Sequence, residues 1–338
     1  MIGLLFFALA AVVIYLQITM APAILKNLFC SYQFDRKLAE PGEEITLTSS
    51  LINGWYFPVL YISFIILLPQ GAKIIDTRQD SKRHRLYLLP RQKYTSDIRF
   101  TLPERGIYRN GRYYLETGDF LGFQSKVVSE ELTANIVIMP ERSQNEPVLN
   151  TLGGYLGDIS VRRFIMEDPV LTIGYRDYTG REAMKNISWK QSARKNQLMV
   201  KNSDYTTDIS VAVVLNMQGN DRILLEESLK LLRSTCEQLE EKRIPYEFLS
   251  NGDTGNCPEG YGNHHFNYLM ARCGRSSLLS YSSFEQLIDR CIKKRKNNRS
   301  YIIITPQLSS SEQIQLDRLQ AVSDHPLCIL VPGGKQDD

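Results

Sequence analysis

Tryptophan, histidine and the common catalytic motifs are scarce or missing in this chain of 338 residues. It has two tryptophans and four histidines, and it contains no G-x-S-x-G, no H-E-x-x-H and no Walker A lysine motif. These absences remove the usual signatures of α/β-hydrolases, zinc proteases and P-loop nucleotide hydrolases. No acid, base and nucleophile can be grouped into one site. We therefore expect a protein that is not an enzyme and needs no cofactor, with catalysis as a lesser alternative.

Cysteine pairs and a strong charge imbalance are also missing. None of the six cysteines forms a C-x-x-C pair, so reduced and mostly buried thiols are expected instead of a disulfide framework. The formal net charge is +3, too small to indicate a nucleic-acid partner. One basic cluster runs from Arg290 to Arg299 without an interleaved aromatic residue. A solvated helix end explains it best, and an anionic membrane surface is the alternative.

The first 25 residues carry no charge, and Lys26 is the first charged residue. An apolar run of 18 to 20 residues is long enough to cross a bilayer as a helix. The sequence "APA" at 21–23 leaves a cleaved signal peptide as the rival interpretation, but no basic residue precedes the run. The flanking charges after it are mostly basic, which favours a cytoplasmic location for the remainder. We predict a single transmembrane anchor over residues 1–25.

Residues 38–140 are expected to form an antiparallel β-sandwich. The segments "EEITLTSSLIN" and "VLYISFIILLP" have the alternation and the β-branched content of strands. The charge-free stretch Ile45–Ala72 is not a second membrane span, because Pro58 and Pro69 leave too few apolar residues between them. We predict two strands there, with a turn at Asn53-Gly54.

The rest of the chain is expected to form a connecting segment, 141–205, and an α/β domain, 206–338. Residues 141–170 are predicted to be loop-like. From "DISVAVVLN" onward, apolar strands alternate with amphipathic helices, which predicts a parallel sheet. The predicted fold class is thus a multidomain α+β chain: a transmembrane helix, a β-sandwich and a parallel-sheet α/β domain.

Two places in the sequence are candidates for a metal ion. The von Willebrand factor A fold has a D-x-S-x-S metal motif after its first strand, and here Asn216, Gln218 and Asn220 hold those positions. Loss of the carboxylate and both hydroxyls removes most of such a site, so no metal is expected. Zinc at Cys257, His264, His265 and Cys273 is likewise disfavoured, because their spacing matches no usual zinc pattern.

The most unusual stretch is "TGREAMKNISWKQSARKNQLMVKN", residues 179–202. Thr179 and Glu182 have the spacing of a capping box, which predicts a helix over Arg181–Ala193. Trp189 and Ala193 are i, i+4 neighbours, and so are Lys190 and Arg194. One side of the helix is therefore expected to bury the indole. Arg176, Lys190 and Arg194 have no such structural explanation and are the candidate binding residues.

These residues resemble the signature of a bacterial family catalogued as domain of unknown function 58. That signature reads approximately R-[DE]-Y, then a G-D region, a basic residue, I-x-W-K-x-[ST]-A-R and L-x-V. The matching positions are Arg176-Asp177-Tyr178, Lys185, Ile187, Trp189-Lys190, Ser192-Ala193-Arg194, Leu198 and Val200. The usual G-D pair is altered: Gly180 is shifted by one position and Glu182 supplies the acid. The segments "PGEEITLTSSLIN" and "LYISFIILLPQG" also resemble the family's upstream β-region, and "ERGIYRNGRYYLETGDFLGF", residues 104–123, is similar to its R-G-x-Y…D-x-x-G-[LF] segment.

The resemblance implies one or two N-terminal membrane helices, a β-region and a degenerate von Willebrand A-like domain. Such proteins are often encoded beside MoxR-type AAA+ ATPases, which implies a partner role. We therefore expect a membrane-anchored cytoplasmic adaptor or scaffold that acts with a MoxR-type ATPase in assembly or maturation of an envelope complex. The alternative is a regulatory module that binds an acidic peptide or a phosphate group at Arg176, Lys190 and Arg194.

Overall fold

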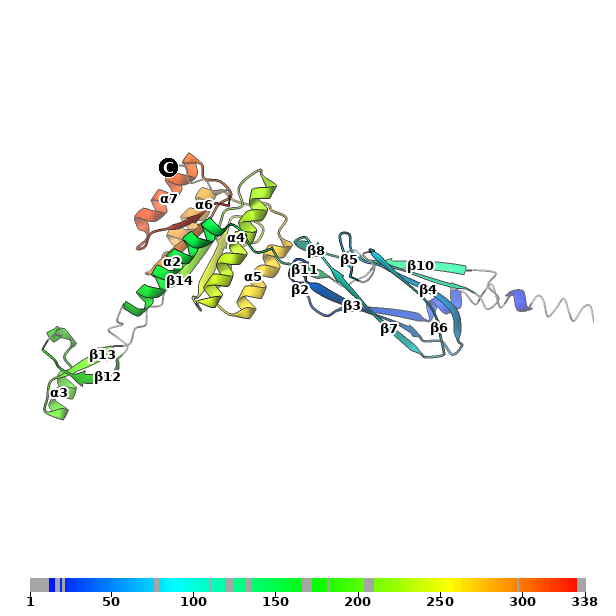
Figure 1. Ribbon diagram of the computed structural model, residues 1–338, viewed down its shortest axis with the longest axis horizontal. Helices are drawn as coiled ribbons and strands as arrows, with labels where there is room; N and C mark the ends of the chain where they lie inside the picture. The colour runs from blue at the N-terminus through cyan, green and yellow to red at the C-terminus, as the bar shows by residue number, and fades with distance from the viewer. Residues whose placement is uncertain are drawn as a thin grey trace, which may run out of the picture. The chain divides into compact units, whose positions relative to one another are not determined.

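The computed structural model describes residues 12–15, 19, 22–75, 79–109, 111–118, 125–131, 135–165, 172–180, 183–203, 210–296 and 298–332. They fall into two compact units (Figure 1). Unit 1 comprises Met1–Glu141 with Cys273–Arg275, and unit 2 comprises Arg142–Arg272 with Ser276–Asp338. The division at residue 141 lies one residue beyond the predicted end of the β-sandwich.

The predicted anchor over residues 1–25 lies largely outside the described residues. Short helical stretches are present at 12–15 and 22–26. No helix within the described ranges is both long enough and apolar enough to cross a membrane.

Unit 1 is a sandwich of two four-stranded antiparallel sheets, extended by a small third sheet. The first sheet has the order β1-β3-β7-β5, the second β10-β9-β4-β6 and the third β2-β11-β8. The strands are β1 (Leu28–Phe34), β2 (Leu38–Ala39), β3 (Glu44–Asn53), β4 (Val59–Leu67), β5 (Lys73–Ile74), β6 (Ser81–Leu88), β7 (Lys93–Thr101), β8 (Gly106–Tyr108), β9 (Arg112–Gly118), β10 (Ser125–Glu131) and β11 (Ile136–Ile138).

The two large sheets share one hydrophobic core. Alternate side chains of β3 and β7 face alternate side chains of β4 and β9, as in Leu47, Phe100, Phe64 and Leu115. The strands predicted at "EEITLTSSLIN" and "VLYISFIILLP" are confirmed as β3 and β4. The chain leaves β3 at Asn53 and crosses to the other sheet before β4, so these two strands are not paired with each other.

Several strands of the sandwich were not predicted, and two of them are long. The first is β1, which places the start of the sandwich at Leu28 instead of residue 38. The second is β6, "SKRHRLYL", whose outward positions carry charged side chains because it is an edge strand of its sheet. Edge strands often carry such charges, so hydrophobic alternation alone does not reveal them.

Residues 141–170 were predicted to be loop-like, and this was wrong for Glu146–Ile165, whereas residues 166–170 lie outside the described residues. Residues 141–165 contain α2 (Glu146–Ile165), a helix of 20 residues that includes the glycines at 153, 154 and 157. Leu152, Leu156 and Ile159 are buried along it, at helical spacing. Packing of this apolar row outweighs the low helix propensity of the glycines.

The α/β part of unit 2 is a five-stranded sheet with helices on both faces. The strands are β14 (Ser210–Leu215), β15 (Tyr246–Ser250), β16 (Cys257–Gly260), β17 (Arg299–Ile304) and β18 (Cys328–Leu330), in the order β16-β15-β14-β17-β18. All neighbours are parallel except β16, which is antiparallel to β15. The predicted parallel sheet is confirmed, whereas β16 and α5 (Asn263–Arg275) were not expected.

The central strands are buried on both faces. On one face, α6 (Phe284–Lys293) and α7 (Ser310–Val322) pack against Ala212, Val214 and Ile303. On the other, α2 and α4 (Arg222–Glu241) contact the sheet (Figure 1). The chain order reverses on either side of β14, so the carboxyl end of β14 is the switch point where such sheets bind ligands.

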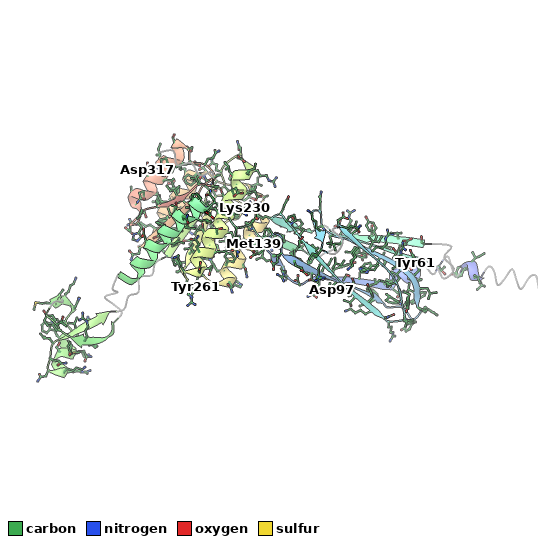
Figure 2. The ribbon with its side chains drawn as sticks, viewed as in Figure 1. Tyr61, Asp97, Met139, Lys230, Tyr261 and Asp317 are labelled. Atoms are coloured by element: carbon green, nitrogen blue, oxygen red, sulfur yellow. The ribbon has the colours of Figure 1, made fainter. Side chains whose placement is uncertain are left out.

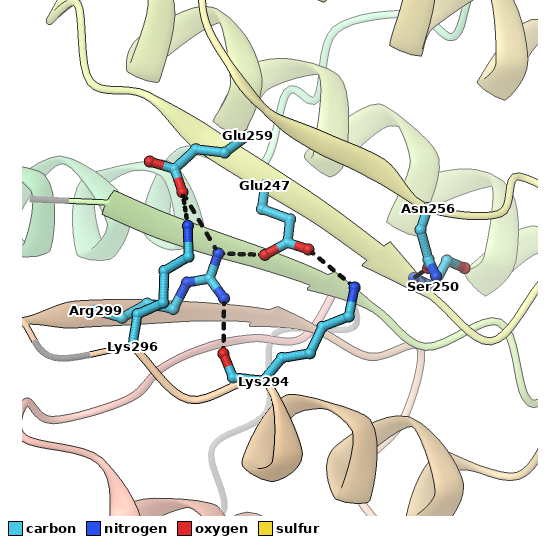
Figure 3. A network of polar contacts seen from close by, with 7 residues as sticks. All are labelled: Glu247, Ser250, Asn256, Glu259, Lys294, Lys296 and Arg299. Atoms are coloured by element: carbon cyan, nitrogen blue, oxygen red, sulfur yellow. Dashed lines mark hydrogen bonds and ion pairs between the residues drawn. The ribbon is translucent and has the colours of Figure 1, made fainter.

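The basic cluster at 290–299 is held in an ion-pair network (Figure 3). Arg299 begins β17, is 1% exposed, and pairs with Glu247 of β15. Lys294 also reaches Glu247, at 3.4 Å, and Lys296 reaches Glu259, at 2.6 Å. Arg295 pairs with Asp324 at 2.8 Å. Because four of the six basic residues already face carboxylates, the cluster is explained by the fold, and the alternative of a membrane-binding surface is not needed here.

We predict that Glu247→Gln destabilises the α/β part of unit 2 by about 3 kcal/mol, because it leaves the buried Arg299 guanidinium without its closest anion. The matched control is Glu259→Gln, which changes a more exposed member of the same network and is expected to cost less than about 1 kcal/mol. Urea unfolding of both variants, followed by circular dichroism, checks this. Equal losses in the two variants would contradict the assignment.

Candidate functional site

Residues 172–180 and 183–203, which we term the signature module, form a small structure of their own. Strand β12 (Thr172–Asp177) pairs antiparallel with β13 (Met199–Ser203). A 3-10 turn, η1 (Met184–Asn186), and the short helix α3 (Trp189–Lys195) lie between them in the chain (Figure 1). Ile187 makes a further bridge to Val200.

Ser192 fixes the helix to the strand. Its hydroxyl donates to the Ser188 carbonyl at 2.9 Å and accepts from the Met199 amide, also at 2.9 Å. The Ser188 amide in turn donates to the Met199 carbonyl at 2.8 Å. Ser188, Ser192 and Met199 are all buried, so these bonds satisfy polar groups that water does not reach. The buried side of α3 is therefore joined to β13 by hydrogen bonds between polar groups.

The predicted helix over Arg181–Ala193 and its capping box are not observed. The helix begins at Trp189, with Ser188 before it, and Thr179 lies outside it. Glu182, the other half of the predicted box, lies outside the described residues. A 3-10 turn at Met184–Asn186 and the extended residue Ile187 precede α3, so an α-helix cannot continue through these residues. Asn196, with a left-handed φ of 54°, then ends the helix.

The prediction that the Trp189 indole is buried was wrong: this side chain is 62% exposed. The physical reason is the close approach of β13 to α3, since the Met199 amide lies 2.9 Å from the Ser192 hydroxyl. That spacing admits a serine and excludes an indole. Ala193, which was expected beside the indole in the core, is also exposed. The apolar residues that are buried in the module are Ile187, Met199 and Val200.

The outward side of the module combines basic and large apolar side chains. Lys190 and Arg194 lie one helical turn apart on α3, and both are exposed. Arg176 lies on β12 opposite Val200, so it belongs to the strand pair and not to the helix. Tyr178 is half-buried, and its amide donates to the Leu198 carbonyl at 2.9 Å. The exposed apolar side chains are Tyr175, Met184, Trp189 and Leu198.

Sequence reasoning missed Tyr175, Met184 and Leu198 as surface residues. They follow no helical or strand periodicity, and a large apolar residue is normally assigned to the core. Their exposure could have been inferred from the small size of the module, because so short a chain segment has little interior to fill.

The switch point at the carboxyl end of β14 is filled by hydrogen bonds within the protein. The buried Asn216 amide donates to Thr305 Oγ1 at 3.1 Å and to Glu312 Oε1 at 2.8 Å. Its oxygen accepts from the Asn251 side chain at 2.9 Å and from the Gln218 amide at 3.0 Å. An asparagine side chain offers two donor hydrogens and two acceptor lone pairs, and all four are used. Asn216 therefore has no oxygen lone pair to offer a cation.

The other polar positions after β14 also serve the fold. The Gln218 side-chain oxygen accepts from the Phe284 amide at 2.9 Å, which joins the loop to the start of α6. Asn220 is exposed. Across the described part of the chain, no cluster of three or more His, Cys, Asp or Glu side chains could hold a metal ion.

Cys257 and His265 lie close together, with 3.8 Å between Sγ and Nδ1, whereas His264 is exposed. The His265 ring packs edge-on against Tyr246, with 4.7 Å between ring centroids. Burial lowers the pKa of His265 below its ordinary value, an effect that the Glu240 carboxylate opposes. Burial also raises the pKa of the Cys257 thiol, although Arg272 opposes the shift. A neutral imidazole beside a protonated thiol is a packed pair and not an activated nucleophile.

Comparison with known proteins adds one distant relative. No family model matches the chain. A search of curated proteins finds "Uncharacterized protein YeaD" of Bacillus subtilis (strain 168), which is 20% identical over 311 residues, covering 90% of this chain and 76% of that protein. The similarity extends over both units, but the name of that protein states no activity.

Two similar solved structures each cover about a third of the chain. One is native alpha-2-macroglobulin of Escherichia coli from domain MG7 to the C-terminus, with 14% identity and a TM-score of 0.26 over 33% of this chain and 17% of that one. Another is the C-terminal domain of wzt, with 6% identity and a TM-score of 0.26 over 34% and 75%. Similarity at this level assigns neither a fold family nor a function.

We predict that Ser192→Ala loosens the signature module, because it leaves the buried Met199 amide without an acceptor, at a cost of about 1–3 kcal/mol. Hydrogen exchange of the amides from Ser188 to Val200 should then become faster. Lys195→Ala, on the exposed side of the same helix, is the control and should leave exchange nearly unchanged. Unaltered protection of Met199 in Ser192→Ala would show that the hydroxyl is dispensable.

A second prediction concerns pH. Because the pKa of His265 is lower in the folded protein, the unfolded state binds more protons as the pH falls below about 6.5, and stability decreases there. Above that pH both states are neutral at this residue and no dependence is expected. His265→Gln should reduce the loss of stability between neutral and acidic pH, whereas His264→Gln should reduce it less, because the charge of this exposed neighbour is a smaller cause of the lowered His265 pKa than burial is. Thermal unfolding across this pH range tests the difference.

Proposed function

We propose that this protein is a membrane-anchored adaptor or scaffold without enzymatic activity, and that the signature module is its docking surface for a protein partner. The observation that carries the proposal is the exposure of Trp189 beside Lys190 and Arg194 on α3. The fold does not use these side chains, since Ile187, Ser192 and Met199 hold the module together.

Charge and composition favour an acidic partner surface with an apolar pocket. Within the described residues of the module, Asp177 is the only acidic residue, and it accepts a hydrogen bond from Gln197 at 2.9 Å. The basic residues of the same ranges are Arg176, Lys185, Lys190, Arg194, Lys195 and Lys201. Tryptophan and arginine are the residue types most often dominant at protein interfaces, with an aromatic anchor at the centre. Surrounding charges mainly accelerate association and select the partner.

The identity of the partner rests on the family resemblance. We propose a MoxR-type AAA+ ATPase, acting with this protein in the assembly or maturation of an envelope complex. The uncharged N-terminal segment supports attachment to the membrane as a single-pass protein, and the basic flank after it supports a cytoplasmic location for the bulk of the chain.

We also propose that the α/β part of unit 2 is a degenerate von Willebrand A-like domain. The doubly wound sheet and the polar residues after β14 support this interpretation. In such a domain, the self-satisfied Asn216 stands where a metal-binding carboxylate would be required. Partner recognition by this protein would then not depend on a divalent cation at that position.

We predict that the double variant Lys190→Glu and Arg194→Glu binds the cognate MoxR-type ATPase at least about tenfold more weakly, which corresponds to about 1.4 kcal/mol. Trp189→Ala should weaken binding by a similar or larger factor, because it removes the apolar anchor. Binding is measured with the purified full-length proteins by sedimentation or light scattering, at two salt concentrations.

The control for this experiment is the double reversal Arg222→Glu and Lys242→Glu, at exposed positions near the two ends of α4. It makes the same change in net charge away from the module and should leave binding unaltered. The melting temperature of all variants should stay close to that of the wild type. If both double variants lose binding equally, the effect comes from overall charge and not from the module. If the module variants bind the ATPase as tightly as the wild type, this surface is excluded.

The second candidate function is a regulatory site for an acidic peptide or a phosphate group. It is favoured by the separation of Lys190 and Arg194 by one helical turn, which lets both cations contact one anion. Titration with inorganic phosphate and with an acidic peptide separates this function from the first. Saturable binding of either ligand, lost in the Lys190 and Arg194 variant, would support it.

A further inference from the structure

One end of the unit 1 sandwich exposes a group of large aromatic and aliphatic side chains. Three chain segments meet there, namely Asn27–Phe29, Asn53–Tyr61 and Tyr87–Lys93, which we term the N-terminal end of the sandwich. The pairing of the strands places them together: Leu28 is opposite Asn53, Ile52 is opposite Lys93, and Val59 is opposite Leu88. Figure 2 shows Tyr61 at this end of unit 1 and Met139 at the other.

The exposed side chains concentrate at this end. Besides Phe29, they are Tyr56, Phe57, Leu60, Tyr61, Tyr87 and Leu89. Elsewhere in the described part of unit 1 from residue 22 onward, the exposed large apolar residues are Ile75 and Val127. A contiguous apolar patch on a folded domain marks a surface that contacts something, whereas scattered single residues do not.

Hydrogen bonds and ring packing hold this surface in shape. The Asn53 side chain donates to the carbonyls of Phe57, at 2.9 Å, and Leu89, at 3.1 Å, so it ties the two loops together. The Trp55 ring packs edge-on against Phe57, with 5.2 Å between centroids. The Arg91 guanidinium lies 4.9 Å from the centre of the Tyr56 ring. The exposed aromatic residues therefore belong to a built surface and not to a loosely placed loop.

Local backbone features also direct side chains outward. The register between β4 and β6 shifts after Val59, so Leu60 and Tyr61 together occupy the place of one residue and both point away from the core. Gly54 lies under the Phe29 ring, where an added Cβ would come within 2.6 Å of Cε2. A side chain at position 54 would therefore displace that ring.

The charged side chains of these three segments and of the neighbouring Lys26 have one sign. Lys26, Arg91 and Lys93 are exposed there, and the segments 27–29, 53–61 and 87–93 contain no aspartate or glutamate. Aromatic residues beside lysine and arginine, without acids, match the composition of protein surfaces at the membrane–water interface. Basic residues near an anionic leaflet add attraction to its headgroups.

The chain itself joins this end to the uncharged N-terminal segment. Ile24 and Leu28 are buried in the sandwich core, and the Asn27 side chain donates to the Ala23 carbonyl at 2.8 Å. Residues 1–25, which carry no charge, therefore lead directly into the same end. At the opposite end, β11 pairs with β2 and β8 and carries the chain out of unit 1.

We propose that the N-terminal end of the sandwich rests on the membrane, with its aromatic and aliphatic side chains in the interfacial layer and its basic side chains against anionic headgroups. This rests on the membrane attachment proposed above and adds to it. The sandwich is then attached to the membrane not only through its anchor, because a defined surface of unit 1 also contacts the bilayer. The bilayer, and not a protein partner, is the occupant of this surface.

The two tryptophans of the chain provide the test, because Trp55 lies at this end and Trp189 lies in the signature module. The full-length protein is reconstituted into vesicles of anionic phospholipids brominated near the headgroup. In Trp189→Phe, the remaining Trp55 should lose fluorescence relative to unbrominated vesicles. In Trp55→Phe, the remaining Trp189 should lose none. Substituting Tyr56, Leu60 and Tyr87 by glutamate in Trp189→Phe should abolish the quenching while the protein still floats with the vesicles.

Each other outcome has a separate meaning. If the protein floats with the vesicles but Trp55 is not quenched, the resting surface is wrong while the anchor stands. If the protein does not float, the proposed membrane attachment fails, and this inference fails with it. If the fluorescence of Trp55 is the same in brominated and unbrominated vesicles and the protein also cross-links to itself, a second copy covers the surface. That result overturns the inference.

Discussion

Three buried polar side chains of this protein find partners within the chain, and the arrangement of its candidate sites follows from that constraint. Arg299 at the start of β17 is matched by Glu247, and Asn216 at the carboxyl end of β14 uses all four of its hydrogen-bonding positions. The Ser192 hydroxyl likewise donates to the Ser188 carbonyl and accepts from the Met199 amide, where α3 contacts β13. At each place a polar residue that could have bound a ligand is committed to the fold. At these three places, the side chains left for a partner are therefore those on the outside.

The elements with strong periodicity could be predicted from the sequence. The alternation in β3, the apolar runs of β14 and β17 and the helical pattern of α4 all gave the correct element type. The capping box predicted for residues 179–182 failed because its spacing is a local pattern, whereas the approach of β13 decides where α3 can begin. Similarly, the glycines of α2 predict a loop, and only the packing of Leu152 and Leu156 makes a helix there.

The candidate surfaces could be predicted in part from the sequence. Lys190 and Arg194 could be selected because nothing in the local pattern explained them, and the structure places both on the exposed side of α3. Trp189 could not be predicted as a surface residue, because a tryptophan at helical spacing normally indicates a buried position. The aromatic end of the sandwich was hidden for a related reason. Its residues come from three segments, 27–29, 53–61 and 87–93, which only the strand pairing brings together.

The two proposals together give the protein a division of labour that suits an adaptor: we propose that one end of unit 1 contacts the membrane and that the signature module of unit 2 binds a partner. The central claim is that Trp189 enters the partner's surface. Its most direct test is the fluorescence of Trp189 in the Trp55→Phe protein as a MoxR-type ATPase is added. The account predicts a blue shift as the indole, now 62% exposed, leaves water. Binding of the ATPase, verified by sedimentation, without any change in Trp189 emission would contradict it.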